Sequence, residues 1–276
     1  MTITDRPQDT GWNQRYGDPH AEPGATGANH VVGLQLGHRS VRRFLPSDVS
    51  DEQLRTLVAA AQSAPTSSNL QPWSVVAVRD PERRRRLATL AARQEFVAQA
   101  PLLLVWVADL SRARRMAERH GRKLEAADYL ETALIGFIDV ALAAQNAVVA
   151  AESLGLGSCF VGAIRNNPEA VAAELGLPPH AMAAFGLAVG LPDPTEDAGV
   201  KPRLPQDAVL HHETYDAARA DRHLDVYDER LADYNERHGL SGAWSDRVLT
   251  RLAGPESMAG RHRLREALEE LGFPVR

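Results

Sequence analysis

The segment from Glu125 to Leu154 constrains the fold more than any other part of the sequence, because it is long, apolar and helical in pattern. Its apolar residues cover much of the helical circumference, which predicts burial on several sides or within a subunit interface. The window 133–151 is apolar enough to suggest a membrane span, but it contains three side chains that are costly in hydrocarbon: Asp139, Gln145 and Asn146. We therefore expect a buried helix, closed by Gly155, in a soluble cytoplasmic protein with no membrane partner.

Shorter helix and strand patterns alternate on both sides of this segment. Helices are predicted after the capping box Ser50–Gln53, after Asp80-Pro81, and from Asn167-Pro168 to Gly176. Strands are predicted at Val75–Val78, Leu102–Ala108, Ser158–Val161 and Ala183–Val189, the first two of them buried. The region Pro192–Pro205 is proline-rich and is expected to be irregular. Because helices and strands interleave around one small sheet, the sequence predicts a mixed α and β class.

Composition limits the classes of function. The 276 residues carry a formal net charge of −5, and 44% are hydrophobic, which is typical of a soluble globular protein with little affinity for nucleic acid. The single Cys159 excludes a disulfide framework and a Cys-cluster zinc site, and it is expected to be a buried, inert thiol. Residues 1–30 lack the apolar segment of a signal peptide and are predicted to form a polar arm, with one domain over 31–276.

Several catalytic and binding motifs are excluded by their context. Gly155-Leu156-Gly157 follows a helix and precedes a strand, the reverse of the order in a dinucleotide-binding fingerprint. Neither lysine follows a glycine, so there is no P-loop, and no Gly-x-Ser-x-Gly elbow anchors a hydrolase triad. His211-His212-Glu213 lacks metal-ligand spacing and is expected to be a solvated turn, so no metal is predicted. The arginine runs at 83–86 and 112–122 have acidic neighbours and are expected to be solvated helix faces.

Three short segments carry the functional signal. His38–Phe44 crowds cationic and hydroxyl side chains together, and Ala64–Trp73 is a row of small hydrogen-bonding groups between a predicted helix and a predicted strand. Lys201–Pro205 is a short basic segment stiffened by prolines. Each segment alone is also consistent with a surface turn. Together they fit an anionic, planar ligand with polar edges.

The order of these motifs resembles the FMN-dependent nitroreductase and flavin reductase family, and most closely its type A branch of oxygen-insensitive NADPH nitroreductases. The likeness runs from about Leu36 to the C-terminus. It is carried by His-Arg-Ser-x-Arg at 38–42, the loop 64–73, Val97–Ala100, Ala144–Ala147, Glu152–Gly157, Gly162–Asn167 and Lys201–Pro205. Five or more ordered matches are far more specific than any single motif.

The resemblance implies a fold and an assembly. It predicts an α+β fold with a central mixed, mostly antiparallel sheet flanked by helices, and an intertwined homodimer with two FMN sites at the subunit interface. It also implies a helical excursion near the C-terminus. In such a dimer the apolar helix at 125–154 forms part of the dimer core, which explains its composition.

The resemblance also implies which residues bind the cofactor and the substrates. Arg39, Lys201 and Arg203 are expected to hold the FMN phosphate, with His38 and Ser40 beside it, because a phosphate dianion needs charge-assisted donors. Arg42 is expected near the pyrimidine edge of the flavin as an electrostatic tuner. The ring and ribityl chain are assigned to Thr66, Ser67, Ser68, Asn69 and Gln94, and flavin N5 and O4 to the backbone of Val161, Gly162 and Ala163. Phe160, Arg237 and His238 are assigned to the substrate or NADPH.

The activity implied is ping-pong reduction of nitroaromatics, quinones or free flavin by NADPH or NADH, with the flavin supplying the chemistry. A histidine, His238, stands where the type A branch commonly has an arginine, and Arg237 precedes it, so the sequence leaves the choice between NADPH and NADH open. The physiological acceptor is open as well. A dedicated flavin reductase, a reductive dehalogenase and a flavin-binding or storage protein without turnover remain alternatives.

Overall fold

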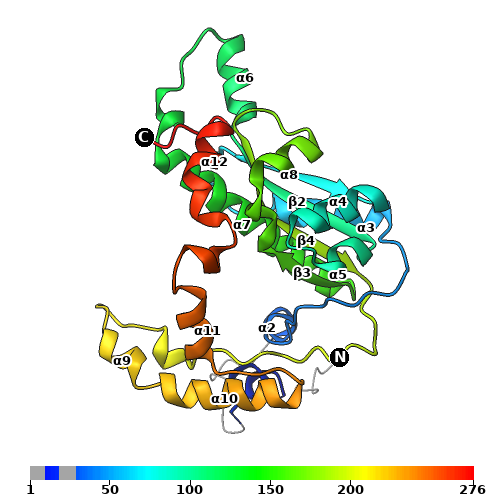
Figure 1. Cartoon of the computed structure of the whole chain (residues 1–276), viewed down its shortest axis with the longest axis vertical. Helices are drawn as coiled ribbons and strands as arrows, with labels where there is room; N and C mark the ends of the chain where they lie inside the picture. The colour runs from blue at the N-terminus through cyan, green and yellow to red at the C-terminus, as the bar shows by residue number, and fades with distance from the viewer. Residues whose placement is uncertain (1–9, 19–28) are drawn as a thin grey trace, which may run out of the picture. The chain divides into compact units, whose positions relative to one another are not determined.

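The computed structural model describes residues 10–18 and 29–276, which belong to two compact units (Figure 1). The helical unit comprises Met1–Arg39 and Asp197–Ser257, and the sheet unit comprises Ser40–Glu196 and Met258–Arg276. The helices of the helical unit are α1 (Thr10–Tyr16), α2 (His30–Leu36), α9 (Ala217–Asp221), α10 (Leu224–Arg237) and α11 (Trp244–Arg251). The sheet unit contains α3 (Asp51–Gln62), β1 (Trp73–Val78), α4 (Pro81–Leu90), α5 (Glu95–Gln99), β2 (Leu102–Asp109), α6 (Ser111–Arg119), α7 (Leu130–Ser153), β3 (Gly157–Val161), α8 (Pro168–Leu175), β4 (Ala181–Gly190) and α12 (Leu264–Glu270).

The sheet has four strands in the order β1-β2-β4-β3, and all three strand pairs are antiparallel. The predicted α+β class is therefore confirmed. The sheet, predicted to be mixed and mostly antiparallel, is antiparallel in all three strand pairs, and each predicted strand is present with slightly wider bounds. A single parallel bridge joins Ser40 to Ser158 at the β3 edge within the described residues. The prediction that Val75–Val78 is fully buried is wrong, because β1 is an edge strand whose Ala77 is exposed.

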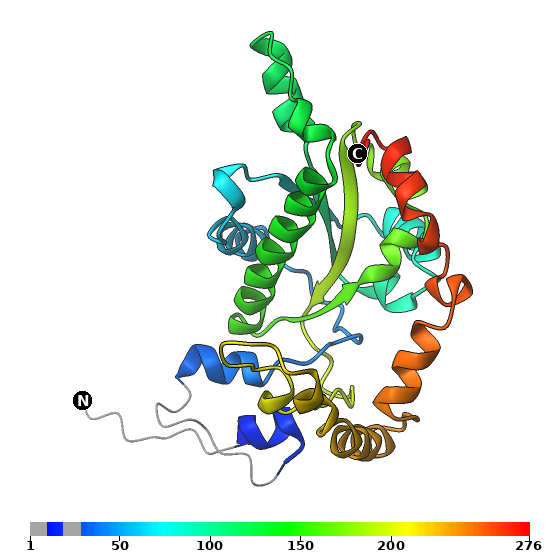
Figure 2. The same ribbon diagram turned by 90° about the vertical axis from the view of Figure 1, so that its left-hand side faces the viewer.

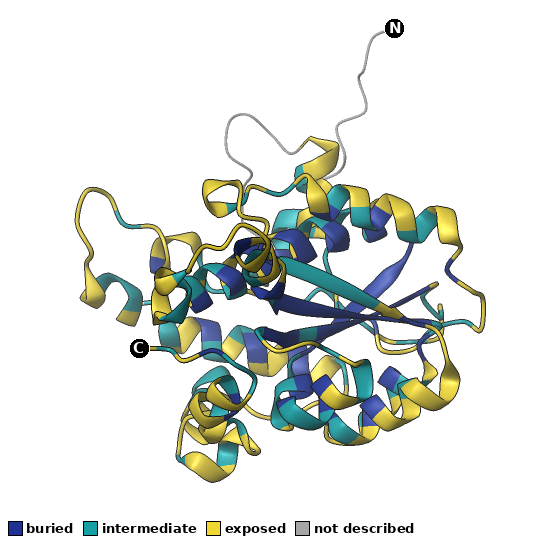
Figure 3. Cartoon of the chain, turned by 90° about the horizontal axis from the view of Figure 1, so that it is seen from above, coloured by how far each residue is buried: buried dark blue, intermediate teal, exposed yellow. Residues whose placement is uncertain are grey.

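Strand β2 is buried on both faces, and it organises the core. Leu102, Leu104 and Trp106 point into a cluster with residues of α3 and α7, whereas Leu103 and Val105 point into a second cluster with α4, α5 and α8. This division follows from the two-residue period of a strand, which sends alternate side chains to opposite faces. Figure 2 shows α3 and α7 on one face of the sheet and α4, α5 and α8 on the other, and Figure 3 shows the buried strands between these layers.

A β-bulge interrupts the pairing of the two central strands. Trp106 pairs with Phe185 and Val107 with Ala183, so Ala184 on β4 has no opposite residue. Its carbonyl accepts a hydrogen bond from the guanidinium of Arg165, which lies in the short 3₁₀ helix after β3. The side chain thus supplies the donor that the ladder lacks at this position.

Local signals set the helix starts as predicted except at the long helix, and one predicted side-chain cap is absent. The capping box of Ser50 and Gln53 begins α3, and Asp80 caps α4 ahead of Pro81. The long helix begins at Leu130 rather than Glu125, because residues 125–128 form a 3₁₀ turn and Tyr129 is extended. Helix α8 starts at Pro168 as predicted, but the side chain of Asn167 makes no capping hydrogen bond.

Helix α7 packs on the sheet with one face only. Its buried side chains face α3 and the sheet, and they are mainly alanine and valine. A stripe on another face is exposed, and we call it the α7 stripe: Leu130, Leu134, Ile138 and Leu142. The helix is long and apolar enough to cross a membrane by length and composition, and 44% of its most apolar window is buried inside the chain. Burial on several sides is therefore not achieved within the described part of the chain alone.

The helical unit is built around α10 and includes part of the predicted polar arm. Tyr227, Leu231 and Tyr234 of α10 are buried. Helix α1 lies within the predicted arm, and its C-terminal end is fixed to α10 because Arg230 donates to the Tyr16 carbonyl at 3.3 Å and pairs with Asp18 at 2.8 Å. The other residues of the arm, 1–9 and 19–28, lie outside the described residues.

The carboxyl group of Asp109 at the end of β2 predicts a pH dependence of stability. Burial alone would raise its pKa, but hydrogen bonds from Ser111 and Ser74, together with the charge of Arg112, outweigh burial and lower the pKa below its usual value. A lowered pKa in the folded state adds stability above the unfolded pKa of about 3.9, and that stability is lost as the pH falls through the folded pKa.

We expect Asp109→Asn to be less stable than the wild type at neutral pH by about 1–3 kcal/mol, because two serine donors lose a charged acceptor. The difference should shrink as the pH falls below about 4. Urea unfolding at a series of pH values measures it. A difference that stays constant over that range would contradict the assignment.

Candidate functional site

The predicted site residues fall on both units. The helical unit carries His38, Arg39, Lys201, Arg203, Arg237 and His238. The sheet unit carries Ser40, Arg42, Thr66, Ser67, Ser68, Asn69, Gln94, Phe160, Val161, Gly162 and Ala163.

In the helical unit, one buried arginine brings the two predicted phosphate-binding segments together. Arg15 of α1 donates to the carbonyls of Leu36 and His38 on one segment, and to the carbonyl of Lys201 on the other. Neither 38–39 nor 197–205 lies in a helix or strand, so side-chain donors are needed to satisfy their backbone. Arg39 and the 201–203 segment are thus parts of one local structure, as the sequence predicted, although Arg15 itself was not predicted.

The cationic side chains of these segments have few anionic neighbours. The exposed guanidinium of Arg39 donates to the Ala198 carbonyl at 2.8 Å, and that of Arg203 donates to the carbonyls of Lys201 and Pro202. No carboxylate of the described residues lies within ion-pair distance of either arginine. Two uncompensated guanidinium groups are what an anion-binding site requires.

Two tyrosines of α10 also contact the basic segment 201–203. The Tyr227 hydroxyl donates to the Pro202 carbonyl at 3.0 Å, and burial raises the pKa of this hydroxyl, so it stays protonated and can donate. The Lys201 ammonium lies 5.4 Å above the ring of Tyr234, a cation–π arrangement. These contacts define the path of the backbone through residues 201–203.

Arg39, Arg237 and His238 line one cavity of about 770 Å³ in the helical unit. The Arg237 side chain is exposed, and within the described residues its guanidinium donates to the carbonyl of Asp233. The His238 ring lies 3.0 Å from a carboxylate oxygen of Asp197 and packs at a tilt of 42° against the Tyr234 ring. It covers Gly199 so closely that a Cβ there would overlap it. Of the two residues assigned to NADPH, Arg237 is therefore the one with a side chain open to the cavity's solvent.

In the sheet unit, the predicted flavin loop is anchored by Asp139 of α7. The Thr66 hydroxyl donates to this carboxylate at 2.5 Å, and the Ser67 N–H donates to it at 3.3 Å. The Thr66 oxygen also accepts the Gln71 N–H at 2.9 Å, which closes the loop on itself. Asp139 is 3% exposed, so these bonds satisfy a buried charge. The polar residue that argued against a membrane span is the anchor of the loop.

The tip of this loop is strained and exposed. Ser68, Asn69 and Gln71 have φ values of 48°, 56° and 49°, in the left-handed region that non-glycine residues rarely adopt. The side chains of Ser67, Ser68 and Asn69 are exposed, although the Asn69 amide oxygen accepts a hydrogen bond from the Gln71 side-chain amide at 3.2 Å. The Thr66 hydroxyl bonds to Asp139 and to the Gln71 N–H. Backbone strain held in this way is typical of functional loops.

Gln94 lies at a second strained turn. It precedes α5 without capping it, and the two residues before it, Ala92 and Arg93, have φ values of 60° and 55°. Its side chain is half-buried and makes no hydrogen bond to the described residues. The amide is therefore free of a capping role, which is consistent with its assignment to the flavin.

The end of β3 presents an aromatic ring followed by small residues. Phe160 is 40% exposed and packs edge-on against Phe185 at 5.2 Å, whereas Val161 and Ala163 are buried. A Cβ at Gly162 would meet only the guanidinium ends of Arg165 and Arg261, at 3.8 and 3.9 Å. By contrast, a Cβ at Gly157 would lie 2.7 Å from Val41. The chain's own packing therefore requires glycine at 157 but not at 162.

Ser40 and Arg42 flank the edge of the sheet beside Cys159. The Val41 N–H between them donates to the Ser158 carbonyl at 2.9 Å, and the Arg42 N–H donates to the Glu196 carboxylate at 2.9 Å. Burial raises the pKa of the Cys159 thiol more than the positive charge of Arg42 lowers it. The prediction that Cys159 is buried is confirmed, and the raised pKa keeps the thiol protonated and unreactive at neutral pH.

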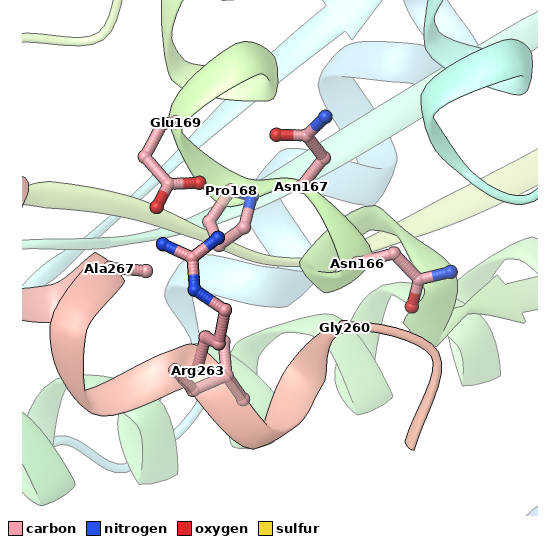
Figure 4. A pocket seen from close by; sticks show the side chains of 8 residues that line it. Asn166, Asn167, Pro168, Glu169, Gly260, Arg263 and Ala267 are labelled. Atoms are coloured by element: carbon pink, nitrogen blue, oxygen red, sulfur yellow. The ribbon is translucent and has the colours of Figure 1, made fainter. Parts of the chain in front are cut away.

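A second cavity of about 170 Å³ lies at the start of α8, and it contains none of the predicted residues (Figure 4). The Arg263 guanidinium points across it toward Pro168 and Glu169, and this arginine is paired with Glu266 at 2.9 Å. Because the positive charge of Arg263 is balanced by Glu266 and the carboxylate of Glu169 also lines the cavity, the cavity has no clear preference for an anion or a cation.

Several arginines of the two runs rejected as binding sites are ion-paired, and most side chains of the runs are exposed. Arg83 and Arg86 share Glu174, Arg85 pairs with Glu82, and Arg114 pairs with Asp128. Their side chains are taken up by surface and half-buried ion pairs.

Sequence reasoning missed the anchoring residues. Arg15 gave no signal, because an isolated arginine in a polar segment has no pattern. Asp139 did give one, since a carboxylate in the middle of an apolar helix needs a partner. Arg165 and Arg261, whose guanidinium groups lie beside Gly162, were also not assigned.

The chain is similar to known proteins over most of its length. The sequence model of the nitroreductase family matches residues 36–191, and that of the C-terminal domain of the same family matches residues 201–276. FMN reductase (NADPH) of Bacillus subtilis is 39% identical over 252 residues, which is 89% of this chain and 98% of that protein. Oxygen-insensitive NADPH nitroreductase of Salmonella typhimurium is 39% identical over 79% of this chain and 89% of that protein. The solved structure of the hypothetical oxidoreductase YcnD from Bacillus subtilis aligns with a TM-score of 0.85 at 36% identity, covering 90% of this chain and 100% of that one.

The loop anchored by Asp139 gives a direct test of the sheet-unit geometry. Asp139→Ala leaves the Thr66 hydroxyl and the Ser67 N–H without their acceptor, and we expect a loss of about 1–3 kcal/mol in the free energy of unfolding. The amides of Ser67 and Gln71 should also exchange hydrogen faster. The matched control is Asn146→Ala on the same helix, whose amide bonds the Ala60 carbonyl rather than the loop. Equal exchange at Ser67 and Gln71 in both variants would refute the anchoring role.

Proposed function

The chain belongs to the nitroreductase family, and on this premise we propose that it is an FMN-dependent NAD(P)H oxidoreductase. The observation that carries the proposal is the pair of exposed guanidinium groups of Arg39 and Arg203, which have no carboxylate partner among the described residues and lie on segments joined by one buried arginine. The names of the relatives, an FMN reductase and an NADPH nitroreductase, supply the class of reaction.

The phosphate of FMN is assigned to Arg39, Lys201 and Arg203, with His38 and Ser40 beside it. Each charge-assisted hydrogen bond to a phosphate contributes about 1.5–3 kcal/mol net. Two or three such bonds supply much of the roughly 8 kcal/mol that a micromolar dissociation constant requires. The carbonyl contacts of Arg39 and Arg203 leave donors of both guanidinium forks available for this purpose.

The flavin ring and ribityl chain are assigned to the sheet-unit residues. Ser67, Ser68 and Asn69 offer exposed polar groups on a loop that is fixed by Asp139, and Thr66 positions that loop. Gln94 contributes a free amide. Gly162 leaves its backbone open on the side where only guanidinium ends approach, so a planar ligand can lie against Val161, Gly162 and Ala163. Phe160, 40% exposed, provides an aromatic wall for a second substrate.

When bound, FMN accepts a hydride from NAD(P)H and passes two electrons to a second substrate. The side chains of this protein bind and orient. Arg42 is assigned to the pyrimidine edge of the flavin, where its positive charge would favour the reduced form, and its backbone N–H is fixed by Glu196. The second substrates proposed are nitroaromatics, quinones or free flavin, all planar acceptors that can stack in turn on the same face.

NADPH is the proposed hydride donor. Arg237 and Arg39 line the same cavity, and the exposed Arg237 guanidinium can meet the additional phosphate that distinguishes NADPH from NADH. His238, held by Asp197 and Tyr234, forms the wall behind it. We place the enzyme in the cytoplasm, where nicotinamide cofactors are available.

A homodimer is proposed from the α7 stripe. Four large aliphatic side chains at helical spacing are exposed on a helix whose other face is buried. A contiguous exposed apolar surface of this kind marks a protein interface. A second copy of the chain, packed through α7, covers the stripe and gives the helix the burial on several sides that its composition predicts.

Purified protein reconstituted with FMN tests the activity. It is expected to be yellow, to bleach anaerobically with NADPH, and to regain colour with a nitroaromatic or a quinone. Steady-state kinetics with NADPH and NADH against each acceptor then distinguish a broad reductase from a dedicated flavin reductase. Colour without bleaching would favour the storage alternative, and protein that binds no FMN would contradict both.

The dimer is tested on the stripe itself. Leu134→Glu places a charge in the proposed interface, and we expect light scattering to show the 30.1 kDa monomer in place of twice that mass. Thr89→Glu, on the exposed face of α4, is the control and should leave the assembly unchanged. A wild-type protein that is monomeric while binding FMN tightly would rule out the proposed interface.

A further inference from the structure

Helix α1, in the segment preceding the family-matched region, contacts the two segments that carry the phosphate-binding residues. We propose that Arg15 is a positioning residue for phosphate recognition, which orients Arg39 on one segment and Lys201 and Arg203 on the other. The inference rests on the proposed function, because the phosphate of FMN is the ligand that these side chains are assigned to bind.

The contacts of Arg15 converge from distant parts of the sequence. Its Nε and one Nη donate to the Leu36 carbonyl at 3.1 and 2.8 Å, and the same Nη donates to the His38 carbonyl at 2.6 Å. The other Nη donates to the Lys201 carbonyl, 186 residues away, at 3.0 Å. The backbone carbonyl of Arg15 in turn accepts the Arg203 N–H at 2.8 Å. One residue therefore fixes the backbone immediately before Arg39, at Lys201 and at Arg203.

These bonds determine where the cationic side chains point. The peptide unit is planar, so fixing the His38 carbonyl also fixes the orientation of the N–H and Cα of Arg39. The same holds for Lys201, whose carbonyl is joined to Pro202, a residue with no N–H of its own and a fixed φ. Both segments lie outside helices and strands, so their backbone carbonyls have no regular hydrogen-bond partners. The guanidinium of Arg15 supplies donors to them instead.

Arg15 is placed well enough for this role. It is 7% exposed, and the turn after its helix is seated on the basic segment: a Cβ at Gly17, which has a φ of +58°, would lie 3.3 Å from Pro202. Arg230 of α10 fixes the end of α1 through the Tyr16 carbonyl and Asp18. The helix that presents Arg15 is therefore anchored independently of the bonds that Arg15 makes.

Residue 15 lies outside both regions matched by the family, which begin at 36 and 201, whereas its partners Leu36, His38 and Lys201 lie inside them. The proposed phosphate-binding residues thus belong to the family-matched part of the chain, and Arg15 adds backbone hydrogen bonds to them from the segment before it. We call this set of bonds the Arg15 clamp. We expect the clamp to affect phosphate recognition rather than the chemistry at the flavin ring.

The test compares FMN with riboflavin, which has the same ring and ribityl chain but no phosphate. Dissociation constants for both flavins are measured by fluorescence titration for the full-length wild type, Arg15→Met, Arg15→Lys and Arg203→Ala. The control Arg219→Met removes an arginine of the same unit whose side chain pairs with Asp207. Thermal unfolding of each flavin-free protein shows whether the variant is folded.

We expect Arg15→Met to weaken FMN binding about tenfold, equivalent to about 1.4 kcal/mol, while riboflavin binding changes less than about twofold. Arg15→Lys keeps the charge but lacks the planar fork, so its FMN affinity should lie between wild type and Arg15→Met. If Arg15→Met does not fold, the lysine variant carries the comparison. Arg219→Met should keep the wild-type ratio of the two affinities.

The outcomes separate the inference from the proposed function. If Arg203→Ala loses FMN selectively and the Arg15 variants do not, the positioning role is overturned and the phosphate assignment stands. If the Arg15 variants weaken FMN and riboflavin equally, Arg15 supports the fold only, and the inference is again overturned. If Arg203→Ala also binds FMN like the wild type, the phosphate assignment itself is wrong.

Discussion

The buried carboxylate of Asp139 is the interaction on which the rest of the sheet-unit site depends. A charge in the middle of an apolar helix is strongly unfavourable unless it is hydrogen-bonded. Here the Thr66 hydroxyl and the Ser67 N–H satisfy it. Those two residues begin a loop whose next residues, Ser68 and Asn69, are held in the left-handed region. The buried charge and the strained loop therefore stabilise each other, because the helix supplies the acceptor and the loop supplies the donors.

In the helical unit the buried charged group is positive, and it is also satisfied by hydrogen bonds to an irregular part of the chain. Arg15 donates to carbonyls of two irregular segments, whose backbone would otherwise lack partners. In both units a buried charged side chain on a regular helix fixes an irregular segment, and that segment carries the exposed polar or cationic groups. Rigid elements thus hold the anchors, and loops present the groups that face a ligand. The separation explains how exposed side chains such as Arg203 and Asn69 can have defined positions without regular secondary structure around them.

The parts of this protein that could be predicted from its sequence are those with local causes. The capping box of Ser50 and Gln53, the proline after Asp80 and the apolar run of β2 each act within a few residues, and each gave the observed element. The sequence placed the start of α7 too early, because the hydrophobic periodicity of the segment does not reveal that Tyr129 is extended. Arg15 and Asp139 could not be assigned because their partners lie 186 and 73 residues away. Of the site, the sequence therefore indicated the exposed groups but not the buried groups that position them.

Helix α7 joins the site to the proposed assembly. Asp139, 3% exposed, faces the loop, and its neighbour Ile138, 57% exposed, belongs to the α7 stripe. Successive residues of a helix point about 100° apart, so one turn of α7 presents the loop anchor on one side and an uncovered aliphatic surface on the other. Packing a second copy against the stripe would restrict rotation and bending of that turn, and so would restrict the Asp139 carboxylate. The same turn of α7 would then hold the loop and form part of the interface. A helix with both roles must be apolar on several sides and carry one buried carboxylate.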